Sequence, residues 1–443
     1  MTLRLLLVRH GLSSFNKDFR IQGRNDLSIL TDEGIKQAVK TGETLSELSI
    51  DVVYSSPLQR AAETTKHILR QHPNKLTPIY TNDLLEVDLG PWSGLTKDEV
   101  KNNFPNEYIT WQKEPKDLVI QRENGTSYKP IQELMLQAQT FVKKLLEDYS
   151  PEKNKTVLIV GHNAILRCIL LNLLGDPDQG LRRLQVDNAS ISIINLKSKK
   201  TNPYDLQIQC LNSTTHLIHT LPSQKDNKRL ILVRHGETNW NLEGRFQGQI
   251  DIPLNQNGQK QALAAGNFLT KVSIDNAYTS PMARPKETAE IILQTHPGVK
   301  LESKEKLVEI AHGLWEGKLE SEIKDSWPKL LEKWQNSPDT VQMPEGENIK
   351  EVWERSVECF ESICKELSTN QTALVVAHDA VNKTILCHLL GLTPSDIWMM
   401  KQGNGGITVI DIPEGKSQPN IVVCLNITSH LGGILDRTAA GAL

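Results

Sequence analysis

The sequence has few cysteines, a small net charge and no long apolar run. Its six cysteines include no Cys-x-x-Cys pair and no spacing typical of a metal site, so neither a disulfide framework nor a zinc centre is predicted. The net charge of −3 gives no electrostatic reason to expect nucleic acid or a membrane as partner. No apolar run reaches the roughly 18 residues that cross a bilayer. Because the N-terminus leads directly into a strand-like stretch, we expect no signal peptide and a cytoplasmic protein.

What the sequence does contain is a duplication. Motifs of the first half recur in the second in the same order and at nearly constant offsets. The matched positions are His10 and His235, Arg60 and Arg284, Glu86 and Glu309, and His162 and His378. Each half has the length of one domain. We therefore predict a domain over residues 1–222, a polar linker over 223–229 and a second domain over 230–443. The tail, residues 431–443, is rich in glycine and alanine and is expected to be mobile or to lie on a surface.

Each half begins with an aliphatic run that leads into Arg-His-Gly. The runs are residues 5–8 and 230–233, and branched aliphatic stretches of this kind are typical of buried parallel strands. Gly236 is expected to allow a sharp turn at the end of the second run. Further strand-like stretches alternate with helical ones. The sequence thus predicts an α/β protein of two tandem three-layer domains, each a mostly parallel sheet flanked by helices. The two histidines then follow the carboxyl ends of strands, where such sheets bind ligands.

Helical segments are predicted to bring arginines to the same edge. A Ser-Ser turn and Pro57 lead into a helix predicted over residues 58–70, with Arg60 in its first turn. Backbone N–H groups at such a helix start can bind an anion. Arg284 follows a Ser-Pro turn in the same way. Residues 96–148 are predicted to be helical with interruptions.

Two arginines, two histidines and one glutamate from each half could act on a phosphate ester. Guanidinium groups match a phosphate dianion in charge and geometry, and a histidine nitrogen can attack phosphorus. Glu86 or Glu309 could protonate the leaving alkoxide and later accept a proton from water. The second histidine could donate to the phosphoryl oxygens. No metal or cofactor is required. The alternative reading is that the histidines are structural residues at strand ends, but their repetition with the same companions favours chemistry.

The second half carries a longer series of motifs. They are Arg234-His235-Gly-Glu-Thr-Asn-Trp-Asn241, Gln247-Gly248, Ser280-Pro-Met-Ala-Arg284, Leu307-Val-Glu309, Pro344-Glu-Gly-Glu347 and Ala377-His378. This half resembles the histidine phosphatase superfamily, also called the phosphoglycerate mutase-like family. The resemblance implies that His235 is the nucleophile and Glu309 the proton donor. It also implies a set of phosphate-binding and pocket residues, namely Arg234, Arg284, His378, Asn241 and Gln247.

The first half resembles the same family less completely. Its matching positions are Arg9, His10, Asn16, Gln22, Arg60, Glu86 and His162, to which the resemblance gives the same roles. It departs in two places. Leu12-Ser13 stands where Glu-Thr usually follows Arg-His-Gly, and the proline-glycine-glutamate loop is replaced by residues 123–127. The departures leave open whether this half is catalytic or a non-catalytic module that binds phosphorylated ligands.

The spacing of the motifs favours a phosphatase over a mutase. Mutases of the family carry a longer insert between the acidic glutamate and the second histidine. Here the separations are 76 residues (86 to 162) and 69 residues (309 to 378). The stretch from Val376 to Lys383 also resembles plant enzymes that dephosphorylate 2-carboxy-arabinitol 1-phosphate. We therefore expect a small phosphorylated sugar or sugar acid as substrate, with a bisphosphoglycerate-dependent mutase as the alternative. The oligomeric state is left open.

Overall fold

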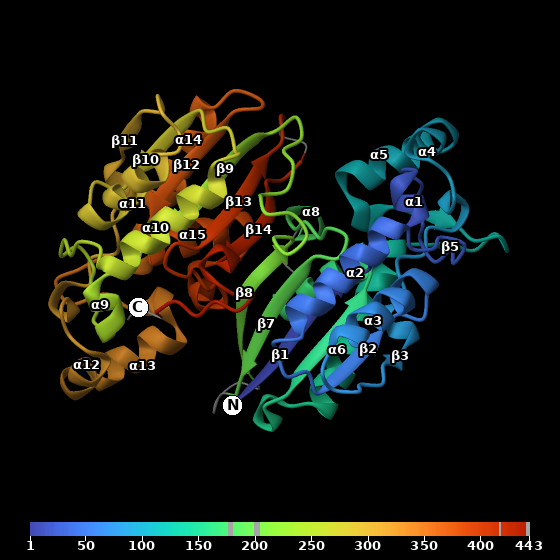
Figure 1. Cartoon of the computed structure of the whole chain (residues 1–443), viewed down its shortest axis with the longest axis horizontal. Helices are drawn as coiled ribbons and strands as arrows, with labels where there is room; N and C mark the ends of the chain where they lie inside the picture. Colours follow the sequence, from blue (N-terminus) through green and yellow to red (C-terminus); the bar gives the residue numbers. More distant parts are fainter. Residues whose placement is uncertain (176–179, 199–203, 416–417, 440–443) are drawn as a thin grey trace. The chain divides into compact units, whose positions relative to one another are not determined.

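The computed structural model describes residues 1–175, 180–198, 204–415 and 418–439 (Figure 1). The chain forms two compact units, Met1–Ile218 and His219–Leu443. Each is an α/β unit in which helices flank a mostly parallel sheet. The fold class predicted from the sequence is therefore confirmed.

In the first unit the strand order is β8-β7-β1-β6-β2-β3. Strands β1, β6, β2 and β3 are parallel, whereas β7 and β8 pair antiparallel at one side. The strands are β1 (Thr2–Arg9), β2 (Val52–Ser55), β3 (Ile79–Tyr80), β6 (Thr156–Gly161), β7 (Ile191–Lys197) and β8 (Asp205–Ser213). The central strand β1 ends at the first Arg-His-Gly motif, as the aliphatic run predicts.

Two pairs of helices pack on this sheet. Helix α2 packs against α3, and α6 packs against α7. Shorter helices and a small hairpin lie between α3 and α6 in the sequence. The helices are α1 (Ser14–Lys17), α2 (Asp32–Leu45), α3 (Gln59–Gln71), α4 (Lys97–Asn103), α5 (Pro105–Lys113), α6 (Pro130–Asp148), α7 (Asn163–Leu173) and α8 (Gly180–Arg183).

The second unit repeats this plan with the strand order β11-β10-β12-β9-β13-β14. Strands β9 to β12 are parallel, and β13 pairs antiparallel with β9 and β14. The strands are β9 (Lys228–Arg234), β10 (Asn276–Thr279), β11 (Leu301–Ser303), β12 (Thr372–Ala377), β13 (Ile407–Ile412) and β14 (Ile421–Ile427). The helices are α9 (Asn239–Glu243), α10 (Gln256–Leu269), α11 (Ala283–Leu293), α12 (Glu320–Ser326), α13 (Pro328–Asn336), α14 (Ile349–Glu366) and α15 (Asp379–Leu389).

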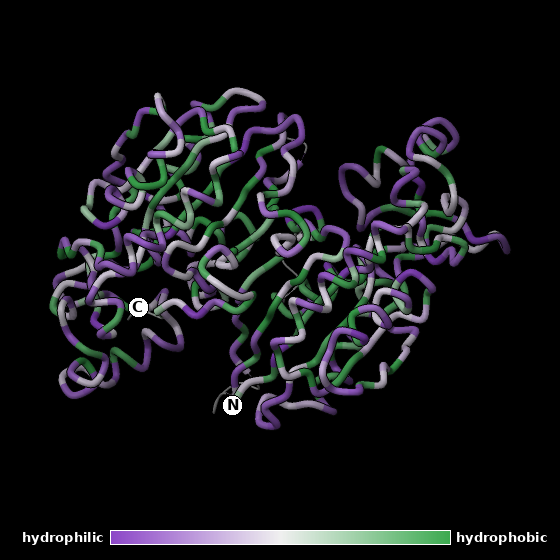
Figure 2. Tube along the Cα trace, in the orientation of Figure 1, coloured by the Kyte–Doolittle hydropathy of each residue, from purple (hydrophilic) through white to green (hydrophobic). Residues whose placement is uncertain are grey.

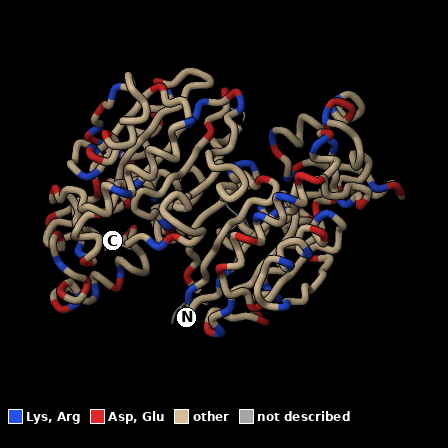
Figure 3. Tube along the Cα trace, in the orientation of Figure 1, with Lys and Arg blue, Asp and Glu red and all other residues tan. Residues whose placement is uncertain are grey.

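The core of the second unit follows the two-residue repeat of the strands. Ile231 and Val233 point to one face of β9, where they join apolar residues of α10 and α11 in one buried cluster. Leu230 and Leu232 point to the other face and are buried as well, next to the packed pair α14 and α15. Burial on both faces explains why the run has no alternation of polar and apolar residues. Figure 2 shows hydrophobic residues concentrated along the strands, and Figure 3 shows acidic and basic residues intermixed along the outer helices and loops.

Three details differ from the sequence predictions. Helix α3 begins at Gln59 with Leu58 as its N-cap, so the proline before it lies outside the first turn. The segment 96–148 contains a hairpin of two short strands, β4 (Ile120–Gln121) and β5 (Ser127–Tyr128), besides its helices. The expected linker is shorter because Arg229 already belongs to β9, where its guanidinium forms a buried ion pair with Asp411 at 2.7 Å.

Candidate active site

The parallel pairing of two strands brings the two histidines of each unit together. In the first unit β1 pairs with β6 so that Arg9 lies opposite Gly161, and His10 N donates to Gly161 O at 3.0 Å. The rings of His10 and His162 are 5.1 Å apart between centroids. In the second unit the rings of His235 and His378 are 5.2 Å apart. Because the paired strands end in register, with Arg9 opposite Gly161 and Arg234 opposite Ala377, both histidines of each unit lie at one edge of the sheet.

The glycine after the first histidine is required by a close approach. A Cβ at Gly236 would lie 2.4 Å from the carbonyl oxygen of Gly258, in the first turn of α10. The corresponding distance in the first unit, from Gly11 to Gly34 O, is also 2.4 Å. Neither Gly11 nor Gly236 has a positive φ. The close approach gives Gly236 a role that the sequence did not predict, since the missing side chain lets the start of α10 pack against the histidine loop.

The hydrogen bonds of His235 fix the protonation of its ring. Nδ1 lies 2.7 Å from Gly236 O, and a carbonyl oxygen can only accept, so Nδ1 carries the proton. Nε2 then bears the lone pair of the ring, which accepts a hydrogen bond from Arg284 Nε at 3.3 Å. Burial, and then the charges of Arg284 and Arg234, hold the pKa of His235 well below its ordinary value. The imidazole is therefore neutral near pH 7, as a nucleophile must be.

His10 makes the same hydrogen bond through Nδ1 in the first unit. Its Nδ1 lies 2.8 Å from Gly11 O, so Nε2 again bears the lone pair. Burial, and then the charges of Arg9 and Arg60, hold the pKa of His10 well below its ordinary value. The structure thus gives both units a neutral histidine of the same tautomer at the end of the central strand.

The second histidine of each unit is oriented by a serine. His378 Nε2 lies 2.9 Å from Ser280 Oγ, and His162 Nε2 lies 2.8 Å from Ser56 Oγ. The Nδ1 atoms of both histidines are buried and have no hydrogen-bond partner among the described residues. A buried polar atom without a partner indicates a missing ligand or water. The serines were not predicted as site residues, although their repeated Ser-Pro turns could have indicated them.

Four arginines line the two sites and are held by backbone carbonyls. Arg284 donates to Gly248 O at 2.8 Å and to Ile250 O at 3.1 Å. Arg60 makes the same pair of bonds to Gly23 O and Asn25 O. Arg60 thus lies in the first turn of α3, as predicted, and its guanidinium binds the loop before α2.

The remaining two arginines follow the central strands. Arg234 Nη1 donates to Gln402 O at 2.6 Å, and Arg9 Nη1 donates to Val186 O at 2.8 Å. The Nε atoms of Arg9, Arg60 and Arg234 are buried without a partner in the described part of the chain. Buried guanidinium donors of this kind are costly unless an anion satisfies them. The arrangement is therefore suited to bind a phosphate group.

The predicted proton donors lie at the starts of the helices that follow the second histidines. Glu309 accepts from the backbone N–H groups of Ile310, Asp379 and Ala380 at 3.0, 3.1 and 3.4 Å. Glu86 accepts from Val87, Ala164 and Ile165 in the same way.

Burial and then the neighbouring Asp379 carboxylate raise the pKa of Glu309. A raised pKa increases the protonated fraction of a carboxyl group at neutral pH, which suits a general acid. The geometry thus allows Glu309 to hold a proton at the edge of the site formed by His235 and His378.

The predicted asparagine and glutamine residues join one network around the histidine loop. Thr238 Oγ1 donates to Gln247 at 2.9 Å and lies 3.2 Å from Asn241 Oδ1. Asn404, which was not predicted, donates to His235 O at 3.1 Å and to Asn241 at 3.3 Å. Since Asn404 braces the loop that carries His235, it belongs to the site.

The first unit builds the same network with Ser13 in the place of Thr238. Ser13 Oγ contacts Asn16 and Gln22 at 3.0 Å each, and Asn188 donates to His10 O at 3.0 Å. The replacement of threonine by serine therefore keeps the hydroxyl that the network needs. Asn188 and Asn404 are separated by 216 positions, as are His162 and His378, and this shared offset is the signal that could have revealed them.

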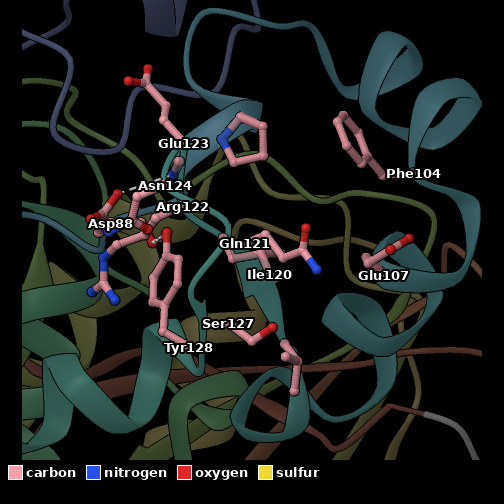
Figure 4. A pocket seen from close by; sticks show the side chains of 13 residues that line it. Asp88, Phe104, Glu107, Ile120, Gln121, Arg122, Glu123, Asn124, Ser127 and Tyr128 are labelled. Atoms are coloured by element: carbon pink, nitrogen blue, oxygen red, sulfur yellow. Dashed lines mark hydrogen bonds between the residues drawn. The ribbon is translucent and has the colours of Figure 1, made fainter.

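A separate cavity of about 1000 Å³ lies in the first unit, beside Asp88 and Gly90 (Figure 4). Asp88, Arg122 and Tyr128 form one wall, and Phe104 and Glu107 lie opposite. The residues that line this cavity include none of the histidines and arginines of the candidate site. This cavity is therefore distinct from the candidate site, in which the reacting groups are almost fully buried.

Comparison with known proteins agrees with this geometry. The model of the histidine phosphatase superfamily (branch 1) matches residues 5–208 and 230–425. The chain belongs to the histidine phosphatase superfamily. It is 30% identical to a 2-carboxy-D-arabinitol-1-phosphatase of Triticum aestivum over 447 residues, which cover 97% of this chain and 86% of the relative. It is 34% identical to phosphoserine phosphatase 1 of Hydrogenobacter thermophilus over 204 residues, 46% of this chain and 94% of the relative.

Solved structures of the superfamily match one unit at a time. Bacillus stearothermophilus YhfR is 31% identical, with a TM-score of 0.44, and covers 46% of this chain and 99% of its own. The superfamily match and the phosphatases among the relatives make this protein a phosphatase.

Within the described ranges, no helix combines the length and apolar character needed to cross a membrane. The described residues also include no group of His, Cys, Asp and Glu that could hold a metal ion.

Proposed function

We propose that this protein is a metal-independent phosphomonoesterase that works through a phosphohistidine, with His235 as the nucleophile of the second unit and His10 as that of the first. The observation that carries the proposal is the bonding of His235. Its Nδ1 is committed to Gly236 O at 2.7 Å, which leaves the Nε2 lone pair beside the Arg284 guanidinium. A phosphate group held by that guanidinium would meet the lone pair directly.

The reaction proceeds in two displacements. The Nε2 lone pair forms a bond to phosphorus while the bond from phosphorus to the ester oxygen breaks, and Glu309 gives its proton to the leaving alkoxide. Glu309, now ionised, accepts a proton from water, whose oxygen attacks phosphorus and breaks the bond to Nε2. Inorganic phosphate leaves, and both side chains return to their starting states. Arg234, Arg284 and the Nδ1–H of His378 stabilise the charge on the phosphoryl oxygens.

Similarity to known phosphatases supports a small phosphorylated sugar or sugar acid as the substrate. The relative that matches 97% of the chain is named a 2-carboxy-D-arabinitol-1-phosphatase, which favours a carboxy-arabinitol phosphate. Relatives that match about one unit include a phosphoserine phosphatase. All of these are compact phosphomonoesters, in agreement with the almost complete burial of the reacting side chains.

The test is phosphate release, measured in the presence of EDTA, from sugar phosphates, phosphoglycerates, phosphoserine and carboxy-arabinitol 1-phosphate. Wild type is compared with His10→Ala, His235→Ala and the double variant. We expect the double variant to be inactive and each single variant to keep the activity of the other unit. If His235→Ala alone abolishes all activity, the first unit is a non-catalytic module. Dependence on a bisphosphorylated primer would instead indicate a mutase. Full activity of the double variant would overturn the proposal.

A further inference from the structure

The helix after the second histidine differs between the two units at two positions one turn apart. In the second unit these positions hold Asp379 and Lys383, which form an ion pair with Nζ and Oδ2 2.7 Å apart. Both side chains are buried, and Asp379 also lies 3.7 Å from Arg234. The lysine charge is therefore already balanced by a carboxylate within the protein.

In the first unit the same positions hold Asn163 and Arg167, and the balancing carboxylate is absent from them. Asn163 Nδ2 donates to Val186 O at 2.8 Å, the same carbonyl that anchors Arg9. Arg167 follows one turn later on the same helix face. Its Nη1 donates to Leu181 O at 3.2 Å, and its Nε is buried without a partner among the described residues.

A second arginine replaces an aromatic residue on the neighbouring wall. In the second unit Trp398 Nε1 donates to Trp334 O at 2.9 Å, and Lys383 Nζ lies 4.9 Å from the centre of the Trp398 ring. In the first unit Arg182 donates to Trp111 O and lies over the Trp111 ring at 5.4 Å. The same backbone contact is thus made by a cation in one unit and by an indole in the other.

The first site therefore carries more positive charge than the second, on Arg60, which is buried, and on three half-buried arginines. Arg167 and Arg182 add to Arg9 and Arg60, whereas the carboxylates that act on Arg167 are Glu86 and Asp187. Burial, and then the charges of Arg9 and Arg182, lower the pKa of Arg167 to about 10. Neighbouring cations with unused donors favour the binding of an anion. The phosphate of the substrate would satisfy Arg9 and Arg60, which leaves Arg167 and Arg182 for another group.

We propose that the first unit takes a phosphomonoester with a second anionic group, a carboxylate or a further phosphate, which the guanidinium groups of Arg167 and Arg182 bind. The second unit lacks this subsite because Asp379 balances Lys383 and Trp398 fills the place of Arg182. The inference rests on the proposed function for the position of the phosphate, but the binding it predicts does not require turnover. The first unit then prefers substrates with a second anionic group, and the second unit does not.

The test measures binding to the full-length His10→Ala/His235→Ala variant by calorimetry, so that no ligand is hydrolysed. The ligands are glycerol 3-phosphate, 3-phosphoglycerate and glycerol bisphosphate, which differ in the second group. We expect Arg167→Met to weaken binding of 3-phosphoglycerate and of glycerol bisphosphate, the two ligands with a second anionic group, by about tenfold or more. This is the value of a charge-assisted hydrogen bond. Binding of glycerol 3-phosphate should change less than twofold. Comparison of 3-phosphoglycerate with glycerol bisphosphate shows whether the subsite prefers a carboxylate or a phosphate.

Matched variants separate this result from a general effect on folding. Lys383→Met, at the corresponding position of the second unit, should leave the preference for a second anion unchanged, and Arg182→Met should reproduce the effect of Arg167→Met. Equal losses for all three ligands, or no loss for any, would overturn the subsite. If the double histidine variant binds these ligands as expected but the wild type releases no phosphate from any compound, the proposed function fails and the subsite stands.

Discussion

A Cβ at Gly403 would lie 2.4 Å from Oδ2 of Asp436. Asp436 belongs to the tail that was expected to be mobile or to lie on a surface, yet its side chain is buried and accepts a hydrogen bond from Asn426 at 3.1 Å. In the first unit the position of Gly403 is occupied by Asp187, which accepts the same bond from Asn212 at 2.9 Å. The second unit therefore takes its carboxylate from the tail, and the missing side chain at Gly403 makes the room.

This exchange connects the tail to the loop of His235, the proposed nucleophile. Thr438 Oγ1 accepts from Asn404 N at 3.1 Å, and Asn404 in turn donates to His235 O at 3.1 Å. The described part of the tail thus holds the residue that braces the histidine loop. The described tail lies partly on the surface, as one of the two expectations had it, since Gly432, Gly433 and Arg437 are exposed, but it is anchored there by the buried Asp436. Residues 440–443 lie outside the described residues.

The contact between Gly403 and Asp436 predicts a non-additive pair of substitutions. Gly403→Ala should displace the carboxylate, and Asp436→Ala should leave Asn426 and Lys401 without it, so each should lower the free energy of unfolding by about 1 to 3 kcal/mol. In the double variant the new methyl group has no carboxylate to displace, and the loss should be smaller than the sum. Urea unfolding of the four proteins of this cycle measures the coupling. Strict additivity would contradict the assigned contact.

The Asp379 carboxylate beside Glu309 predicts a shift in the pH dependence of the second unit. A general acid must be protonated, so activity falls as the pH rises through its pKa. Asp379 raises the pKa of Glu309, and Asp379→Asn should therefore lower that pKa. The alkaline limb of kcat/KM should move to lower pH.

The measurement is made in the His10→Ala background, so that phosphate release comes from the second unit. Asn163→Asp, the reciprocal change in the first unit, serves as the matched control and should leave the profile in place. An unchanged alkaline limb in Asp379→Asn, or a shift to higher pH, would show that Glu309 is not the group that limits activity there.

Much of the site could be predicted because the aliphatic runs identify the buried strands, and the site residues follow directly after the ends of these strands. The aliphatic runs before His10 and His235 have to be buried, and parallel pairing then aligns their ends with those of the strands before His162 and His378. In each unit, the convergence of two histidines with the arginines therefore follows from local patterns. The duplication strengthened each assignment because each residue is found twice.

Contacts made by loops and by the tail could not be predicted in this way. Arg60 donates to backbone carbonyls of a loop about 35 positions earlier in the sequence. Because every residue has a backbone carbonyl, the sequence does not show which of them will accept such a bond. The two-residue strands β4 and β5 are too short to show an alternation. In the second unit Asp436 of the tail takes the place that Asp187 has in the first. A contact of this kind, between the tail and a distant part of the chain, cannot be predicted from the spacing of apolar residues.

The Arg284 guanidinium beside His235 predicts a second change in pH dependence. A positive charge disfavours protonation of the ring, and Arg284 helps to hold the pKa of His235 well below its ordinary value. Arg284→Gln removes this charge, so the pKa should rise and the acid limb of kcat/KM should move to higher pH. Loss of the guanidinium that we propose to bind the phosphate should also reduce kcat/KM by about 100-fold or more.

Phosphate release as a function of pH in the His10→Ala background tests both effects. Wild-type activity of the second unit should persist at pH 6.5, where an ordinary histidine would be half protonated. Arg60→Gln is the control, since it removes the corresponding guanidinium of the first unit. An acid limb that stays in place in Arg284→Gln would argue against His235 as the group that must be neutral.

The serine that contacts the second histidine is expected to set its tautomer. Ser280 Oγ lies 3.4 Å from Met282 N, from which it accepts, and 2.9 Å from His378 Nε2, so its own proton is free for the histidine. A serine that donates to Nε2 leaves the proton on Nδ1, the atom without a partner. Ser280→Ala should therefore mix the two tautomers and reduce kcat by about tenfold to 100-fold, the usual cost of losing an orienting partner.

Both limbs of the pH profile of Ser280→Ala should stay in place, since neither His235 nor Glu309 is altered. Ser56→Ala in the same His10→Ala background should have no effect, and an active Ser280→Ala would show that the hydroxyl does not orient His378.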